Sequence, residues 1–98
     1  MSAREQVLGT LRELLPGLRE ELGVRELYLF GSVARGEDTP HSDINVLVEV
    51  GPEATLFTLA RIKHRLQAAL LRPVDLGTCE GLSRAARERV LKERVRVA

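Results

Sequence analysis

The 98-residue sequence predicts an α/β fold in which a small mixed sheet of three or four strands packs against helices. Two observations support this prediction. Apolar residues recur at helical spacing in two long segments, residues 2–22 and 55–71. Short apolar runs bounded by Gly, Pro and Ser, at residues 25–30, 43–50 and 74–77, are typical of strands. We expect residues 1–98 to form a single domain.

The first segment predicts a helix that begins after Ser2 and ends at Gly23. Ser2 and Glu5 have the spacing of a capping box, and Gly23 is a typical helix stop. The residues at helical spacing are Val7, Leu8, Leu11, Leu14, Leu15, Leu18 and Leu22. Pro16 interrupts them, so we expect a kink or a break into two short helices. The helix is predicted to cover one face of the sheet.

Residues 27–50 contain the predicted site, which starts with a turn that suits phosphate. A short apolar strand ends at Phe30, and Gly31 allows a tight turn that leaves room for a ligand. Ser32 then starts a helix, whose free N–H groups and positive dipole end favour anions. Arg35, one turn further on, can add a charged fork to a phosphate.

A second strand follows the polar loop of residues 36–42 and opens with possible metal ligands. Because side chains alternate along a strand, Asp43 and Asn45 point to one side, about 6–7 Å apart. The core side is formed by Ile44, Val46, Val48 and Val50. Two oxygen ligands beside a phosphate-binding turn make a magnesium site plausible, and such a metal can hold and activate a nucleoside triphosphate.

The remaining segments complete the sheet and its helices. A turn at residues 51–52 leads to a helix over residues 55–71, and a strand at 74–77 follows Arg72-Pro73. The stripe expected to be buried on the first of these is Leu56, Leu59, Ile62, Leu66, Ala69 and Leu70.

A final helix is expected from Leu82 to about Glu93, capped by Ser83, with a last short strand at 95–98. This helix is rich in arginine, so it can bind an acidic partner or form an ordinary exposed face. In the strand at 74–77, Asp75 is flanked by apolar residues, and its position alone fits an aspartate of an edge strand.

The composition is that of a globular protein and excludes several classes. Hydrophobic residues make up 44% of the chain and charged residues 30%. No apolar run approaches the ~18 residues of a membrane span. The net charge of +1 implies no strong attraction to nucleic acid. One cysteine excludes an internal disulfide, and the N-terminus lacks a secretory pattern, so we expect a cytoplasmic protein.

Three groups of residues follow one another in the central stretch: Gly31-Ser32, Ala34-Arg35-Gly36-Glu37 and Ser42-Asp43-Ile44-Asn45. Together they closely resemble the signature of the minimal nucleotidyltransferases, small relatives within the DNA polymerase β nucleotidyltransferase superfamily. That signature is Gly-Ser, a spacer and Asp-x-Asp, with a third acidic residue on a later strand. The resemblance covers most of the chain. The chain departs from it at Asn45, where the family has its second metal-binding Asp.

The resemblance implies the polymerase β-like nucleotidyltransferase fold and transfer of a nucleoside monophosphate, AMP from ATP, to a hydroxyl acceptor. The nucleotide-binding residues that it implies are Gly31, Ser32 and Arg35. The implied Mg²⁺ ligands are Asp43, Asn45 and Asp75, of which Asp43 and Asp75 are catalytic. In the family, the position of Asp75 also helps to deprotonate the attacking hydroxyl. Because an amide carries no charge, we expect Asn45 to weaken one of the family's two metal positions.

The resemblance also implies a partner. Minimal nucleotidyltransferases are commonly paired with a helical HEPN-domain protein, as antitoxin to its toxin, and some transfer AMP to a tyrosine of that toxin. A chain this short has little room for its own acceptor-binding domain, which fits an acceptor delivered by another protein. Two alternatives stay open: a catalytically weakened module that binds the nucleotide or the toxin, and a transferase for a small molecule. Exposed leucines would also be compatible with a homo- or hetero-oligomer.

Overall fold

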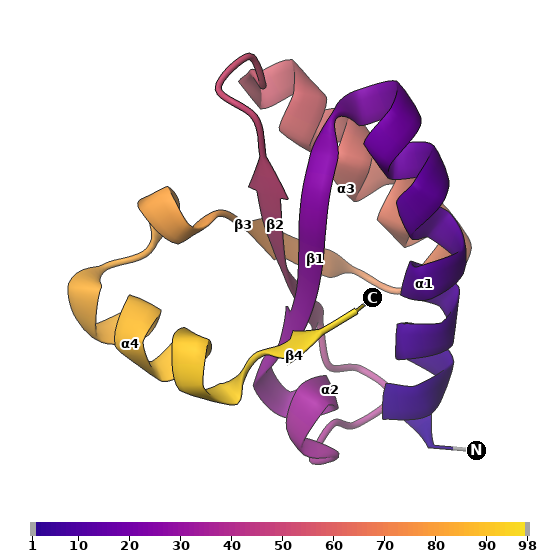
Figure 1. The fold of residues 1–98 in the computed structure, drawn as a ribbon. Coiled ribbons are helices and arrows are strands. Elements are labelled where there is room, and N and C mark those ends of the chain that lie inside the picture. Colours follow the sequence, from indigo (N-terminus) through magenta and orange to yellow (C-terminus); the bar gives the residue numbers. More distant parts are fainter. Residues whose placement is uncertain (1, 98) are drawn as a thin grey trace.

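The computed structural model describes residues 2–97, which are organised around one four-stranded sheet (Figure 1). The strands are β1 (Val24–Phe30), β2 (Ile44–Val50), β3 (Val74–Gly77) and β4 (Val95–Arg96), in the order β3-β2-β1-β4. β1 is antiparallel to both β2 and β4, whereas β2 and β3 are parallel. The predicted mixed sheet is confirmed. The last strand is confirmed at Val95 and Arg96, and Ala98 lies outside the described residues.

Helices lie on both sides of this sheet. They are α1 (Ala3–Leu22), α2 (Gly31–Arg35), α3 (Leu56–Leu70) and α4 (Arg84–Glu93), with a 3₁₀ turn, η1 (Cys79–Gly81), before α4. In Figure 1, α1 and α3 cover one face, and η1 and α4 lie on the other side. Within residues 2–97, no helix has the length and hydropathy needed to cross a membrane.

Several predicted boundaries shift because flanking residues serve as caps. Thr55 is not helical: its hydroxyl accepts the N–H of Thr58 at 3.3 Å, and the Thr58 hydroxyl accepts the N–H of Thr55 in return. The final helix begins at Arg84 rather than Leu82, because η1 precedes it and Ser83 is its N-cap, as predicted. These residues use their side chains to bind N–H groups that a helix leaves free at its start.

The sequence predicts a kink or a break into two short helices at Pro16; α1 is a single helix of 20 residues, so the break is wrong. Proline removes one hydrogen bond, but Pro16 faces solvent, and the opposite side of the helix is anchored by buried leucines. The ends agree with the prediction. The Ser2 hydroxyl accepts the N–H of Glu5 at 3.2 Å, and Gly23 ends the helix with a φ of 70°.

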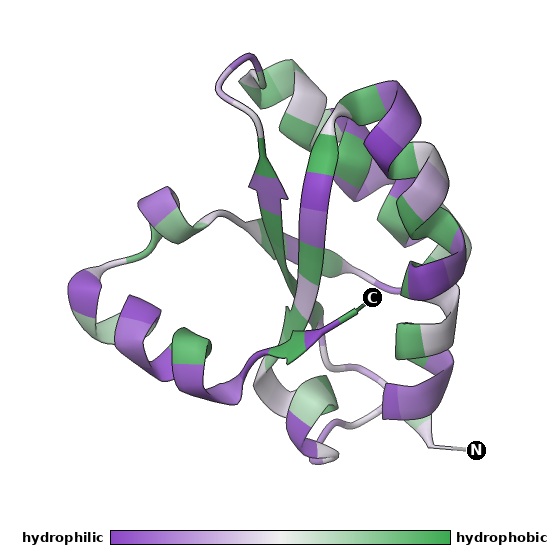
Figure 2. Ribbon diagram, in the orientation of Figure 1, coloured by the Kyte–Doolittle hydropathy of each residue, from purple (hydrophilic) through white to green (hydrophobic). Residues whose placement is uncertain are grey.

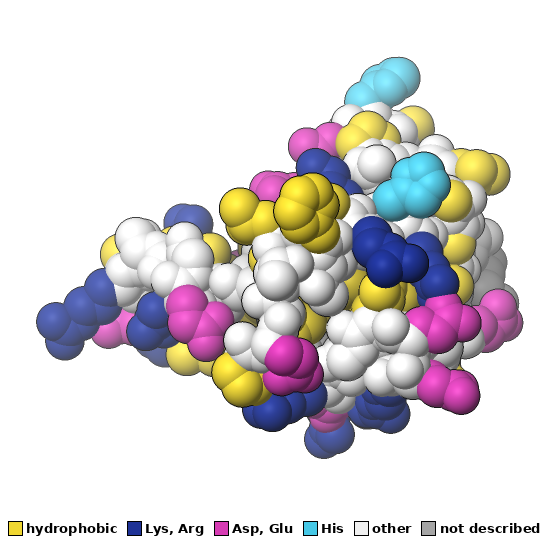
Figure 3. Space-filling model, turned by 90° about the horizontal axis from the view of Figure 1, so that it is seen from above, with side chains coloured by type: hydrophobic (Ala, Val, Ile, Leu, Met, Phe, Trp, Pro, Cys, Tyr) yellow, Lys and Arg dark blue, Asp and Glu magenta, His cyan; other side chains and the backbone are white. Residues whose placement is uncertain are grey.

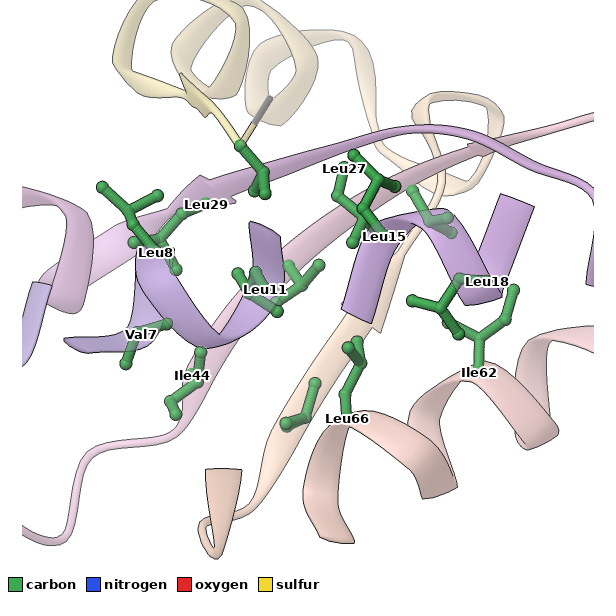
Figure 4. Packing of buried hydrophobic residues seen from close by; sticks show 14 of the residues in the cluster. Val7, Leu8, Leu11, Leu15, Leu18, Leu27, Leu29, Ile44, Ile62 and Leu66 are labelled. Carbon is green, nitrogen blue, oxygen red and sulfur yellow. The ribbon is translucent and has the colours of Figure 1, made fainter. Parts of the chain in front are cut away.

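The main hydrophobic core lies between α1, α3 and the sheet (Figure 4). In Figure 4, Leu18 of α1 lies beside Ile62 of α3, and the two helices share one core. β1 contributes the buried residues Leu27 and Leu29. β2 contributes Ile44, Val46 and Val48, which confirms its predicted core side at these three residues. Each fully buried leucine side chain contributes roughly 1.5–3 kcal/mol. Figure 2 shows hydrophobic residues along the inner sides of these helices.

The predicted buried stripe of α3 is wrong at Leu56 and Ala69, whereas Leu59 and Leu70 pack against the core. Leu56 is 83% exposed and Ala69 is exposed, whereas Ile62 and Leu66 in the middle are completely buried. Leu56 is the first residue of the helix, where the chain has only just left the β2–α3 connection. Helical spacing predicts which face points inward, but it does not predict how far along the helix the core extends.

A smaller cluster covers the opposite face of the sheet and attaches α4. Tyr28 and Leu47 pack there against Val90 of α4, surrounded by Phe30, Cys79 and Leu82. The Tyr28 hydroxyl donates to Glu49 Oε1 at 3.4 Å, and the guanidinium of Arg94 lies 3.9 Å from the ring centroid. Burial raises the pKa of the Tyr28 hydroxyl above its ordinary value.

Candidate functional site

A cleft of about 470 Å³ opens where β1, α2, β2 and α4 meet. Its lining residues are Phe30, Gly31, Ser32, Arg35, Asn45, Arg89, Val90 and Glu93. Four of the residues predicted from the sequence, Gly31, Ser32, Arg35 and Asn45, are therefore brought together in one place. Asp43 and Asp75 do not line this cleft, but both are close to Asn45 in the chain or in the sheet.

Gly31 provides the space at the centre of the cleft. Its φ of 77° lies in the left-handed region that favours glycine. A Cβ at this position would overlap the side-chain amide of Asn45, so the lack of a side chain is also required for packing. The predicted tight turn is confirmed, although α2 starts at Gly31 rather than at Ser32. Phe30 precedes α2 without a side-chain cap, which leaves the first N–H groups of the helix free of a capping side chain.

The parallel pairing of β2 and β3 brings two predicted metal ligands side by side. Asn45 pairs in register with Asp75, so the two side chains stand on the same face of adjacent strands. Asn45 also pairs with Phe30 on its other side, which connects β2 to the Gly31 turn. Asp43 is exposed and lies one residue before β2, which starts at Ile44 rather than at Asp43.

The cleft holds charges of both signs. Arg35 donates through Nε to Glu37 Oε2 at 3.0 Å and through Nη1 to Glu93 Oε2 at 3.2 Å. The hydrogen bond that Arg35 donates to Glu37 is the main cause that raises the pKa of the Arg35 guanidinium. A phosphate that binds Arg35 must therefore compete with these carboxylates. Arg89 lines the same cleft and forms none of the salt bridges found within residues 2–97.

The residues present suit a magnesium ion that is bound partly by side chains and partly by phosphate oxygens of a substrate. Within residues 2–97, no three His, Cys, Asp or Glu side chains form a group that could hold a metal. The predicted set instead has two carboxylates, from Asp43 and Asp75, and the amide oxygen of Asn45. Mg²⁺ is usually bound by one or two carboxylates together with substrate phosphates and water. The donor set fits that type of site.

Helix α4 contributes cleft residues that the sequence-based prediction missed. They are Arg89, Val90 and Glu93, one of which also pairs with Arg35. A signal was present, because residues 89 and 93 are one helical turn apart and flank the apolar Val90. The position of α4 against the sheet was not predictable from that spacing, since it depends on the small cluster around Tyr28 and Leu47.

The chain is similar in sequence to nucleotidyltransferases. The family described as "Nucleotidyltransferase domain" matches residues 11–97. Over 86 residues the chain is 37% identical to "Putative protein adenylyltransferase MJ0435" of Methanocaldococcus jannaschii, which covers 88% of this chain and 91% of that protein. It is 34% identical over 97 residues to "Protein adenylyltransferase MntA" of Thermococcus cleftensis, with coverage of 99% and 98%.

Solved structures share the fold. One described as "Structure of putative minimal nucleotidyltransferase" has a TM-score of 0.81 and 36% identity, and covers 97% of this chain and 95% of that chain. A more distant one is a tri-AMPylated Shewanella oneidensis HEPN toxin in complex with MNT antitoxin. It has a TM-score of 0.60 and 20% identity, with coverage of 98% and 69%, and at this identity the similarity concerns the fold alone. The predicted fold class is confirmed.

Proposed function

The chain belongs to the nucleotidyltransferase domain family, and from this premise we propose that it transfers AMP from ATP to a hydroxyl of a partner protein. The two relatives named as protein adenylyltransferases support this chemistry, because each aligns with most of the chain. The single observation that carries the proposal is the cleft at Gly31. There a residue without a side chain lies against Asn45, which is paired with Asp75 on the neighbouring strand.

In the proposed reaction, the acceptor oxygen attacks the α-phosphorus of ATP. A new P–O bond forms while the bond from that phosphorus to the oxygen bridging to the β-phosphate breaks, and pyrophosphate leaves. Asp75 takes the proton of the hydroxyl. The Gly31-Ser32 turn and Arg89 hold the triphosphate, and Arg35 joins them when a phosphate replaces Glu93. When bound through Asp43, Asn45 and Asp75, Mg²⁺ supplies positive charge to the phosphate oxygens.

The proposed acceptor is a HEPN-domain toxin, for which the chain serves as a cytoplasmic antitoxin. The fold shared with an MNT antitoxin bound to an AMPylated HEPN toxin supports this choice. The surface is also compatible with a protein partner, because Leu56, Phe57 and Leu71 are 83%, 83% and 85% exposed. Figure 3 shows hydrophobic side chains exposed beside His and Lys or Arg side chains on the upper face of the molecule.

The test is transfer of label from α-labelled ATP to a purified HEPN-domain protein, with Mg²⁺ present. We expect the chain to label the partner and Asp75→Asn to lower the rate by roughly 100-fold or more, because the general base is lost. Asn45→Asp should raise the rate, since it adds a charged metal ligand. Arg84→Ala is the surface control, because Arg84 is 96% exposed and does not line the cleft, and it should change nothing.

Other outcomes would favour the alternative functions. Label that appears only with Asn45→Asp would identify a weakened binding module whose second metal position has been lost. If the chain binds and neutralises the toxin tightly, but neither the parent chain nor Asn45→Asp transfers label to it, the enzyme hypothesis is ruled out. Label on small hydroxylated molecules in the absence of a partner would indicate a small-molecule transferase.

A further inference from the structure

We propose that Arg72 is a positioning residue that holds the two predicted metal-binding carboxylates, Asp43 and Asp75, in their places. The inference rests on the proposed function, because it concerns the same site. Arg72 lies in the short connection between α3 and β3, and its side chain is only 20% exposed. It does not line the cleft, so its effect on the site must pass through the chain that it holds.

Arg72 reaches the segment of residues 38–43, here called the site loop, which ends at Asp43. Its Nη2 donates to the carbonyl of Ser42 at 2.6 Å and to that of Thr39 at 3.1 Å, and its Nη1 donates to Asp38 Oδ2 at 3.4 Å. Ser42 immediately precedes Asp43. The guanidinium therefore fixes the carbonyl of the peptide bond that leads into the predicted metal ligand.

The site loop also contains internal hydrogen bonds, both between backbone groups and to side chains. The Ser42 N–H donates to the Thr39 carbonyl at 3.0 Å, and the Thr39 N–H donates to Ser42 Oγ at 2.9 Å. Within residues 2–97, the side-chain hydrogen bonds that reach the loop from outside all come from Arg72. Loop segments with few outside contacts open easily, so one guanidinium with three contacts has a large share in holding this loop.

The same connection also places β3. The Pro73 carbonyl, one residue after Arg72, accepts the N–H of Ile44 at 2.9 Å. Two residues further on, Asp75 stands beside Asn45 in the parallel pair. Arg72 and Pro73 therefore contact the chain on both sides of Asp43. β3 begins directly after Pro73, and Asp75 is its second residue. Both carboxylates depend on the same short connection.

The connection has features that do not favour stability. Among residues 2–97, Leu71 alone has a left-handed backbone without being a glycine. Its φ is 57°, and its side chain is exposed. The buried Nε of Arg72 makes no hydrogen bond within the described residues. Both features cost free energy. The left-handed Leu71 is the C-cap that ends α3, whereas a role of the guanidinium in placing the site loop accounts for the burial of Arg72.

The experiment compares Arg72→Lys, which keeps the charge but cannot form the fork, with Arg65→Ala and Leu71→Gly as controls. Arg65 is an arginine of α3 and pairs with Glu21 on the surface. Leu71→Gly relieves the left-handed backbone and leaves the guanidinium in place. Binding of Mn²⁺ to the protein with ATP is measured by electron paramagnetic resonance, and hydrogen exchange is measured at the Ser42 amide.

We expect Arg72→Lys to lower Mn²⁺ affinity by roughly 10-fold, as loss of groups that orient metal ligands commonly does, and to speed exchange at Ser42. Arg65→Ala and Leu71→Gly should leave both values unchanged. In label transfer, kcat should fall with little change in KM for ATP. Guanidinium ion added to Arg72→Ala should restore part of the Mn²⁺ affinity.

Unchanged Mn²⁺ affinity in a folded Arg72→Lys would overturn the inference while the proposed function stands, provided that the parent chain labels its partner. If the parent chain binds neither ATP nor Mn²⁺, the proposed function itself fails. If both Arg72 variants unfold, Asp38→Ala decides, because it keeps Arg72 and removes one acceptor of the fork. We then expect a smaller loss of Mn²⁺ affinity, and no loss would count against Arg72.

Discussion

At the scale of single residues, Gly31 has two separate reasons to be glycine. One is its positive φ, and the other is the side chain of Asn45, which occupies the space that a Cβ would need. Gly36 ends the same short helix with a similar φ of 73°, but a Cβ there would meet nothing within 4 Å. The two glycines therefore form a matched pair that separates backbone strain from the overlap with Asn45.

We predict that Gly36→Ala lowers the free energy of unfolding by about 1 kcal/mol, the cost of a left-handed alanine. Gly31→Ala should lower it by a further ~1 kcal/mol or more, because Asn45 must also move. It should also weaken ATP binding, which Gly36→Ala should affect less. Urea denaturation and nucleotide titration measure both effects. Equal losses of stability would show that Asn45 moves aside without cost.

Tyr28 permits a direct test of burial in the small cluster, because the chain has one tyrosine and no tryptophan. Burial raises its pKa in the folded state above the ordinary value of 10.0. The folded protein thus holds the hydroxyl proton more tightly than the unfolded chain does. This contribution to stability is fully present below pH 10.0 and is lost as the pH rises through the folded pKa.

We predict that the tyrosinate absorbance appears at higher pH in the native protein than in the protein unfolded in urea. The stability of the parent protein should decline in the same pH range, and the stability of Tyr28→Phe should decline less steeply. Coincident titrations in the two states would mean that the hydroxyl is not desolvated by α4.

At the scale of elements, α1 shows how packing overrides a local breaker. Pro16 disrupts the hydrogen-bond ladder in the middle of the helix, yet the helix continues because leucines on its other side are buried. Gly17 follows it, and a Cβ at Gly17 would meet nothing within 4 Å. The pair therefore allows the missing hydrogen bond to be compared with plain helix propensity.

We predict that Gly17→Ala raises the free energy of unfolding by about 0.5–1 kcal/mol through helix propensity. Pro16→Ala should raise it more, by about 1–3 kcal/mol, because it also restores the N–H that bonds the carbonyl of Arg12. Thermal and urea unfolding measure the difference. Destabilisation by Pro16→Ala would instead show that the packing of the leucines depends on the proline.

At the scale of the whole molecule, the two faces of the sheet are covered unequally. Helices α1 and α3 share the large core, whereas α4 is attached through a small cluster and the Arg35–Glu93 pair. Since α4 carries Arg89 and Glu93 to the cleft, the less firmly attached side of the molecule is also the side that closes the site.

We predict that amide hydrogen exchange is faster in α4 than in α1 and β1, and that ATP slows exchange in α4 more than elsewhere. Val90→Ala should speed exchange in α4 and weaken ATP binding, with little change in α1, because Val90 is the buried residue of α4. Leu66→Ala in the large core is the control, and it should speed exchange across the molecule. Uniform exchange in all elements would show that α4 opens only with global unfolding.

The sequence by itself determined the elements and the Gly31 turn. Helical and strand periodicities lie within contiguous residues, and so do the spacing from Gly31 to Asn45 and the caps at Ser2 and Ser83. The physical preferences that produce them act over a few residues, which is why the helices, strands and core side of β2 were predictable. Misplaced boundaries and the break at Pro16 arose where packing outweighed such local preferences.

Only the tertiary structure decided how these parts combine. Three contacts join residues about 30 or more positions apart. They are the pairing of Asn45 with Asp75, the ion pair of Arg35 with Glu93, and the hydrogen bonds of Arg72 to the site loop. Such contacts depend on strand order and on which face each helix covers, and no local pattern encodes them. They follow from burying two apolar faces of one sheet at once, a condition that applies to the whole chain.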